Sequence, residues 1–143
     1  MVVSLNHVGI AVQDLPRMKL LFSILGLPAG SSERADDQGV EVHFVPLPQE
    51  KIQIELLDPI DPEGTVARFI AKKGPGIHHL SFLVGQGELE GFSQKLKKEG
   101  FRLIYPQAKL GAHGMRVNFI HPATTGGVLI EIMEPGWKSE SPK

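Results

Sequence analysis

The sequence predicts an α+β fold in which two βαβββ modules pair into one curved mixed sheet. Two motifs occur twice and in the same order. HVGIAV at residues 7–12 returns as HLSFLV at 79–84, and IELLDP at 54–59 returns as IEIMEP at 130–135. The paired histidines are 72 residues apart and the paired glutamates 76, a difference that one loop insertion absorbs. A single module would leave one face of its sheet bare, so two modules are expected to associate.

The first module is expected at about residues 4–62. Residues 4–12 alternate between apolar and small or polar side chains, which predicts a strand. Asp14, Pro16 and a helical apolar spacing then predict a helix of about ten residues that ends at Gly26. We expect a polar turn at 31–38, followed by strands at 39–45 and 52–57. In the second of these strands, Glu55 shares a face with Gln53 and Leu57.

The second module is expected at about residues 76–135, after a connector helix at 65–73. Its predicted elements are a strand at 77–84, a helix at 88–99 capped by Gly100, and strands at 102–105, 115–120 and 128–133. Together the modules predict a single domain over 1–137, and residues 138–143 read as a polar tail.

Composition excludes several classes of function. Fifteen Lys and Arg against sixteen Asp and Glu give a net charge of −1, so no basic surplus indicates nucleic acid. Cysteine is absent, which excludes disulfides, thiol catalysis and thiolate metal sites. The first twelve residues lack a basic segment and a long apolar run, so we expect a cytoplasmic protein without a membrane partner.

The repeat also predicts a metal site in a cleft of the sheet. If the first and last strands of each module are neighbours, two histidines and two glutamates converge, namely His7, Glu55, His79 and Glu131. Such a set suits an octahedral divalent ion with two positions open, such as Co²⁺, Mn²⁺, Fe²⁺, Ni²⁺ or Zn²⁺. The alternative is that both histidines are core residues that donate to backbone carbonyls. By strand alternation, His78 should point to the opposite face and is not expected to be a ligand.

These motifs resemble the vicinal oxygen chelate (glyoxalase/bleomycin resistance) superfamily, and within it the methylmalonyl-CoA epimerases. Besides HVGIAV, the resemblance rests on GIHHL at 76–80, GAHG at 111–114 and TGGVLIE at 125–131, and it covers nearly everything from Asn6 to Pro135. It implies paired βαβββ modules, usually a homodimer, and one divalent ion on the same four residues, for which we favour Co²⁺. The implied reaction exchanges the two C2 epimers of methylmalonyl-CoA through a metal-stabilised enolate.

The acid and base of that reaction are less clearly marked. The family's catalytic glutamate aligns with Val42, and Glu41 lies one residue away, so Glu41 would face the wrong way unless the strand register slips by one. Glu131 is therefore the favoured proton-transfer residue and Glu41 the second candidate. His43 is expected at the surface. The sequence gives no pattern that selects the basic residues for the phosphates of coenzyme A.

The sequence also predicts a possible substrate contact in a glycine-flanked turn, and it leaves two other functions open. His113 and Gly114 precede a strand, where backbone N–H groups can approach a substrate carboxylate, although an ordinary tight turn has the same pattern. One alternative function is a glyoxalase I-type lyase acting on a glutathione hemithioacetal. The other is a metal-free binding module of the bleomycin-resistance kind.

Overall fold

The computed structural model describes residues 3–136, which fold as two compact units. One unit is Asn6–His79, and the other combines residues 3–5 with residues 80–136. The predicted polar tail lies outside the described residues.

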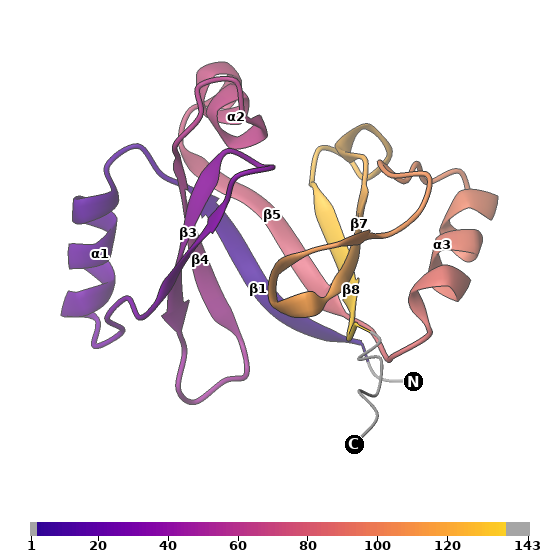
Figure 1. The fold of residues 1–143 in the computed structure, drawn as a ribbon, viewed down its shortest axis with the longest axis horizontal. Coiled ribbons are helices and arrows are strands. Elements are labelled where there is room, and N and C mark those ends of the chain that lie inside the picture. The colour runs from indigo at the N-terminus through magenta and orange to yellow at the C-terminus, as the bar shows by residue number, and fades with distance from the viewer. Residues whose placement is uncertain (1–2, 137–143) are drawn as a thin grey trace. The chain divides into compact units, whose positions relative to one another are not determined.

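In the unit Asn6–His79, four strands lie in the order β2-β3-β4-β1 (Figure 1). β1 and β4 are parallel, whereas β3 is antiparallel to both β2 and β4. The elements are β1 (Ser4–Ala11), α1 (Leu15–Ile24), β2 (Ser32–Ala35), β3 (Val40–Pro46), β4 (Gln53–Pro59), α2 (Thr65–Lys73) and the beginning of β5 (Gly76–Leu83).

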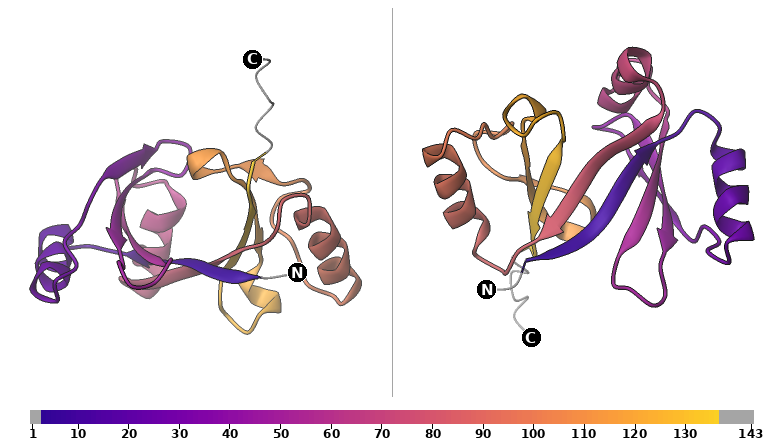
Figure 2. Two further views of the ribbon diagram at one scale, coloured as in Figure 1. Left: turned by 90° about the horizontal axis from the view of Figure 1, so that it is seen from below. Right: turned by 180° about the vertical axis from the view of Figure 1, so that it is seen from behind.

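The two helices of this unit pack on opposite faces of its strands. Val42, Phe44 and Leu57 form one apolar cluster with Val66 and other side chains of α2. Val45 and Leu56 form a second cluster with side chains of α1. In the ribbon views, α1 lies on the outer side of these strands (Figure 2). Because alternate strand residues face opposite ways, Glu55 lies on the face of Leu57, as the sequence predicts.

The helix boundaries follow the predicted signals. Asp14 caps α1 by accepting a hydrogen bond from the backbone N–H of Arg17 at 3.1 Å. Gly26 follows the helix with φ 79°, a conformation that glycine adopts without strain. α2 spans the predicted residues 65–73. The cap and the glycine together explain why α1 begins and ends where the sequence predicts.

The other unit places four strands in the order β5-β8-β7-β6. Its elements are the rest of β5, α3 (Leu89–Lys98), β6 (Lys109–Leu110), a turn of 3₁₀ helix (Ala112–Gly114), β7 (Arg116–Ile120), a second such turn (Pro122–Thr124) and β8 (Ile130–Glu134). β5 and β8 are parallel, whereas β7 is antiparallel to both β6 and β8. Apolar side chains of α3 pack against Ile120 and Ile132.

Both units therefore contain the βαβββ arrangement, and the predicted α+β fold class is confirmed. The paired positions also repeat, because Gly9 lies opposite Glu55 in the β1–β4 pair and Ser81 opposite Glu131 in the β5–β8 pair. Among the described residues, no helix has the length and apolar character needed to cross a membrane.

Two predicted segments are wrong. Residues 32–35, expected in a turn, form strand β2, and residues 102–105, expected as a strand, contribute only an isolated bridge between Leu103 and Ile120. The strand at that place in the second unit is β6, which has two residues. Both β2 and β6 are short edge strands in which exposed side chains predominate, so neither has the apolar alternation by which a strand is recognised.

Candidate metal centre

Three of the predicted ligands come together within the unit Asn6–His79. His7 on β1, Glu55 on β4 and His79 on β5 each offer one ligand atom, and these atoms lie within 4.8 Å of one another. The parallel β1–β4 pair sets this arrangement, since His7 lies opposite Gln53 and Gly9 opposite Glu55. In the part of the chain that the structure describes, these three residues form a possible metal-binding group.

The two imidazoles meet edge to face. Their Nε2 atoms are 3.0 Å apart, and the ring planes make an angle of 88°. His7 is 4% exposed and His79 7% exposed, so both rings are shielded from solvent. Gly9 leaves room for His79, because a Cβ atom at this position would meet the ring.

This donor set fits a divalent ion. Nitrogen ligands bind Zn²⁺ at about 2.0–2.1 Å, so two imidazoles at right angles around such an ion have their donor atoms about 3.0 Å apart. The Nε2 separation of 3.0 Å has this value. Two imidazoles and a carboxylate without thiolate are borderline to hard ligands, which suit first-row divalent ions.

Each histidine also has a partner at its outer nitrogen. Nδ1 of His7 lies 2.8 Å from Oδ1 of Asn6 and 3.1 Å from Oε2 of Glu55. Nδ1 of His79 lies 2.9 Å from Nδ1 of His78. The two neighbouring rings therefore meet at their Nδ1 atoms although their residues alternate along β5, and His78 is not among the three residues whose ligand atoms lie together.

Glu131 belongs to the other unit, where it is 8% exposed on β8. It lies opposite Ser81 on β5 and Phe119 on β7. Its position in the β5–β8 pair is equivalent to that of Glu55 in the β1–β4 pair. A buried carboxylate is costly to desolvate, which favours a functional role for this residue.

Glu41 and His43 lie on the face of β3 opposite to Val42 and Phe44. Phe44 is paired with Glu55, so the register is not slipped and Glu55 shares its face with Val42 rather than with Glu41. Oε1 of Glu41 accepts a hydrogen bond from Oγ of Ser32 at 3.1 Å. His43 is 8% exposed, so its expected place at the surface is wrong. It shares a face of β3 with Val45, and that face is covered by side chains of α1.

The turn at residues 111–114 has an unusual backbone. His113 has φ 58°, which makes it the single described residue other than glycine with a positive φ. This left-handed conformation is uncommon outside glycine. Gly114 follows with φ 72°, and both residues are exposed.

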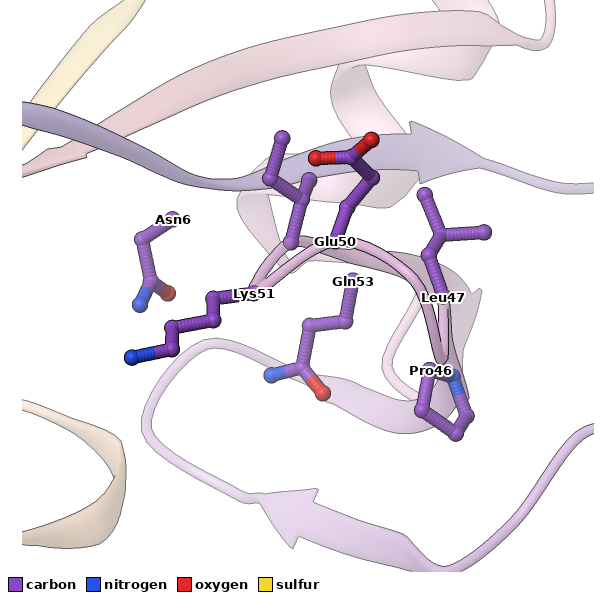
Figure 3. Close-up of a pocket in the computed structure, with 7 residues that line it drawn as sticks. Asn6, Pro46, Leu47, Glu50, Lys51 and Gln53 are labelled. Atoms are coloured by element: carbon purple, nitrogen blue, oxygen red, sulfur yellow. The ribbon is translucent and has the colours of Figure 1, made fainter.

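A small pocket opens at the turn between β3 and β4. Its volume is about 270 Å³. Figure 3 shows the side chain of Lys51 running in the direction of Asn6, whereas that of Glu50 points the other way. The pocket therefore adjoins the metal centre through Asn6, whose Oδ1 is bonded to His7. The lining residues are Asn6, Pro46, Leu47, Glu50, Lys51, Ile52 and Gln53.

Comparison with known proteins agrees with this fold. The model of the Glyoxalase/Bleomycin resistance protein/Dioxygenase superfamily matches residues 6–119. The chain is 38% identical over 130 residues to the mitochondrial methylmalonyl-CoA epimerase of Bos taurus, covering 90% of this chain and 72% of that protein. It is 37% identical over 135 residues to the ethylmalonyl-CoA/methylmalonyl-CoA epimerase of Cereibacter sphaeroides, covering 92% and 98%.

A solved structure of a methylmalonyl-CoA epimerase has the same fold as this chain. The crystal structure of methylmalonyl-CoA epimerase from Mycobacterium tuberculosis superimposes with a TM-score of 0.84 at 40% identity, covering 94% of this chain and 89% of that one. The chain therefore belongs to the glyoxalase/bleomycin resistance/dioxygenase superfamily and, within it, to the methylmalonyl-CoA epimerase family. The resemblance inferred from the sequence motifs is confirmed.

Sequence reasoning missed the residues that surround the ligands. Asn6 and His78 each precede a ligand histidine, and this repeated placement was the one available signal. Lys51 had no signal, because a single lysine in a turn resembles the other basic residues of the chain.

Proposed function

We propose that this protein is a methylmalonyl-CoA epimerase, which interconverts the two C2 epimers of methylmalonyl-CoA. The main support is the grouping of His7, Glu55 and His79 in a chain whose relatives carry that name. The C2–H bond of the substrate lies between a thioester and a carboxylate, so its proton is acidic enough for a side-chain base. Removing the proton from one face and returning one to the other inverts the centre.

The proposed metal site consists of His7, Glu55, His79 and Glu131. A divalent ion held there would act as a Lewis acid toward the thioester and carboxylate oxygens, with Co²⁺ favoured over Mn²⁺, Ni²⁺, Zn²⁺ or Fe²⁺. The first three ligands are supported by their mutual distances. Glu131 is supported by its burial and by a strand register equivalent to that of Glu55.

Proton transfer at C2 is assigned to Glu131. A carboxylate can take a proton from one face of C2 and return one to the other, and Glu131 is buried on β8, where water is excluded. Glu41 remains the second candidate, but it lies on the α1 side of β3, away from the face of Glu55. The register therefore favours Glu131.

The turn at His113 and Gly114 is a proposed substrate contact. Two successive residues with positive φ expose backbone N–H groups in a short turn, and such groups bind anions such as a carboxylate. The left-handed His113 supports this role, since strained backbone is often retained at functional sites.

The pocket beside Asn6 is the proposed entry for the arm of coenzyme A. Its polar lining includes the amide groups of Asn6 and Gln53, which can bond the amides of that arm, and the ammonium group of Lys51, which can meet a phosphate. Pro46, Leu47 and Ile52 give it apolar walls for the methylene groups. The pocket adjoins Asn6, whose Oδ1 bonds His7, so its place suits a substrate whose thioester is held at the metal.

The test is an epimerisation assay with a single epimer of methylmalonyl-CoA, before and after removal of metal by a chelator. We expect conversion to the other epimer, loss after chelation and recovery with Co²⁺. Activity with methylglyoxal and glutathione instead would assign a glyoxalase I-type lyase. Substrate binding without turnover and without any bound metal would assign a metal-free binding module. The expected homodimer and cytoplasmic location remain predictions, the first of which light scattering after gel filtration would check.

A further inference from the structure

The residue before each ligand histidine lies against the outer nitrogen of that histidine. Asn6 places Oδ1 2.8 Å from Nδ1 of His7, and His78 places its Nδ1 2.9 Å from Nδ1 of His79. We propose that Asn6 and His78 are positioning residues. Each holds the neighbouring ligand histidine in the tautomer whose Nε2 carries no proton and faces the metal. This inference rests on the proposed metal site, whereas the identity of the substrate does not enter it.

The tautomer of His7 follows from its two partners. The carbonyl oxygen of Asn6 and the carboxylate oxygen of Glu55 are acceptors, so Nδ1 of His7 carries the proton and donates it. In a neutral imidazole the other nitrogen then has a free lone pair. His7 therefore presents a bare Nε2 toward His79, which is the form that can bind a cation.

His79 has two possible tautomers, because its partner is another imidazole. In one, His78 donates from Nδ1 to His79, and Nε2 of His79 donates to Nε2 of His7 at 3.0 Å. In the other, His79 donates from Nδ1 to Nδ1 of His78, the proton of His78 is on Nε2, and Nε2 of His79 is bare. The second form alone can bind a metal through Nε2.

Metal binding should therefore exchange the tautomers of both rings. Each imidazole keeps one proton, which moves from Nε2 to Nδ1 in His79 and from Nδ1 to Nε2 in His78, so no net proton is released by this pair. A side chain that can both donate and accept at the same atom is needed for this exchange, and histidine meets that need. No such exchange is needed at His7, because His7 already has the tautomer that binds a metal. A residue that can only accept at this atom, the Oδ1 of Asn6, is therefore sufficient there.

The connector helix orients His78. The ring of Phe69 on α2 lies edge to face against His78, with ring centroids 5.0 Å apart. Phe69 also packs against the apolar cluster of the sheet. The orientation of His78, and through it that of His79, therefore depends on the docking of α2.

The experiment measures the affinity of the purified protein for Co²⁺ and Zn²⁺ by competition with a chromophoric chelator. Asn6→Leu and His78→Leu remove the acceptor, and we expect each to weaken binding roughly 10–100-fold. Asn6→Asp and His78→Asn keep an acceptor oxygen near the same place, and we expect most of the affinity to return. His121→Asn is the control, because Nδ1 of His121 accepts from the N–H of Ala123 within a turn of the other unit, and the change should leave the affinity unchanged.

Equal affinities in the two Leu variants and the unaltered protein would overturn the proposal. Equal weakening by His78→Leu and His78→Asn would also overturn the acceptor role of His78 and leave only packing. A thermal melt of each variant shows whether it is folded.

Nitrogen-15 NMR of the histidine rings in the Zn²⁺-loaded protein gives a second readout. We expect the proton of His79 on Nδ1 and that of His78 on Nε2, and a proton on Nδ1 of His78 would contradict the proposal. A protein that binds no divalent ion would overturn both the metal site and this inference. A protein that binds metal but does not epimerise methylmalonyl-CoA would overturn the proposed reaction alone.

Discussion

The ring of His79 fills the space that a side chain at Gly9 would occupy. A Cβ atom on Gly9 would come closer than 3.0 Å to three atoms of the His79 ring, a separation that real Cβ atoms essentially never show. The absence of a side chain at residue 9 is therefore a condition for the 3.0 Å approach between the two ligand histidines.

Gly9→Ala should consequently displace His79 and weaken metal binding. We expect a loss of roughly 10–100-fold in affinity for Co²⁺, similar to the loss of a group that orients a ligand. A chelator-competition titration measures it. Gly91→Ala in α3 is the matched control, because its Cβ would meet open space and should leave the affinity unchanged while stabilising the helix by about 1 kcal/mol. Unchanged affinity in Gly9→Ala would mean that His79 is not a ligand in the observed position.

Glu131→Gln should abolish turnover and weaken metal binding. The amide is nearly isosteric with the carboxylate but cannot take a proton as a base, and it is a poorer ligand for a hard cation. Steady-state kinetics with metal-loaded protein and the same competition titration measure the two effects separately.

Glu41→Gln should keep the metal affinity of the unaltered protein, because Glu41 lies on the other face of β3 from Val42 and Phe44. Its turnover decides between the two candidate bases. Full activity in Glu131→Gln together with its loss in Glu41→Gln would reverse the assignment.

Glu134 should prove to be a stabilising residue, although it lies three residues after Glu131. It is 2% exposed, and its Oε1 accepts from Nη1 of Arg116 at 2.9 Å. Its Oε2 accepts from the N–H of Leu89 at the start of α3 at 3.1 Å. Glu134→Ala should lower the free energy of unfolding by about 1.5–3 kcal/mol in a urea titration, since the buried N–H of Leu89 loses a charged partner. An unchanged unfolding free energy would show that these bonds contribute little.

Lys51→Ala should raise the KM for methylmalonyl-CoA about two- to fivefold with little change in kcat, as expected for an exposed charge pair with a phosphate. A thioester truncated before the phosphates should show no change. Lys98→Ala at the end of α3 is the control. If both thioesters respond equally to Lys51→Ala, the pocket at the β3–β4 turn does not hold the arm of coenzyme A.

The fold could be predicted from the sequence wherever burial imposes a pattern. The repeat of His7 with His79 and of Glu55 with Glu131 predicted the module order, because equivalent residues of two similar modules occupy equivalent registers. The capping Asp14 and the glycine after α1 predicted that helix. Strand β2 was missed because three of its four residues are exposed, and an exposed edge strand is under no constraint to alternate.

The surroundings of the ligands could not be predicted in the same way. Alternation places His78 and His79 on opposite sides of an ideal strand, but it does not describe how far two adjacent rings can turn toward each other at their Nδ1 atoms. The bond from His7 to Asn6 likewise depends on side-chain rotamers, which leave no period in a sequence. The burial of His43 depends on which face of β3 is covered by α1, and a single histidine gives no sign of that.

Deuterium exchange tests the central claim most directly. Methylmalonyl-CoA is incubated in D₂O with the chelator-treated protein, with and without added Co²⁺, and mass spectrometry follows deuterium at C2. We expect exchange that requires both the ion and Glu131, together with conversion between the epimers. Absence of exchange in metal-loaded, folded protein would contradict it, and the chain would then share only the fold of the epimerases.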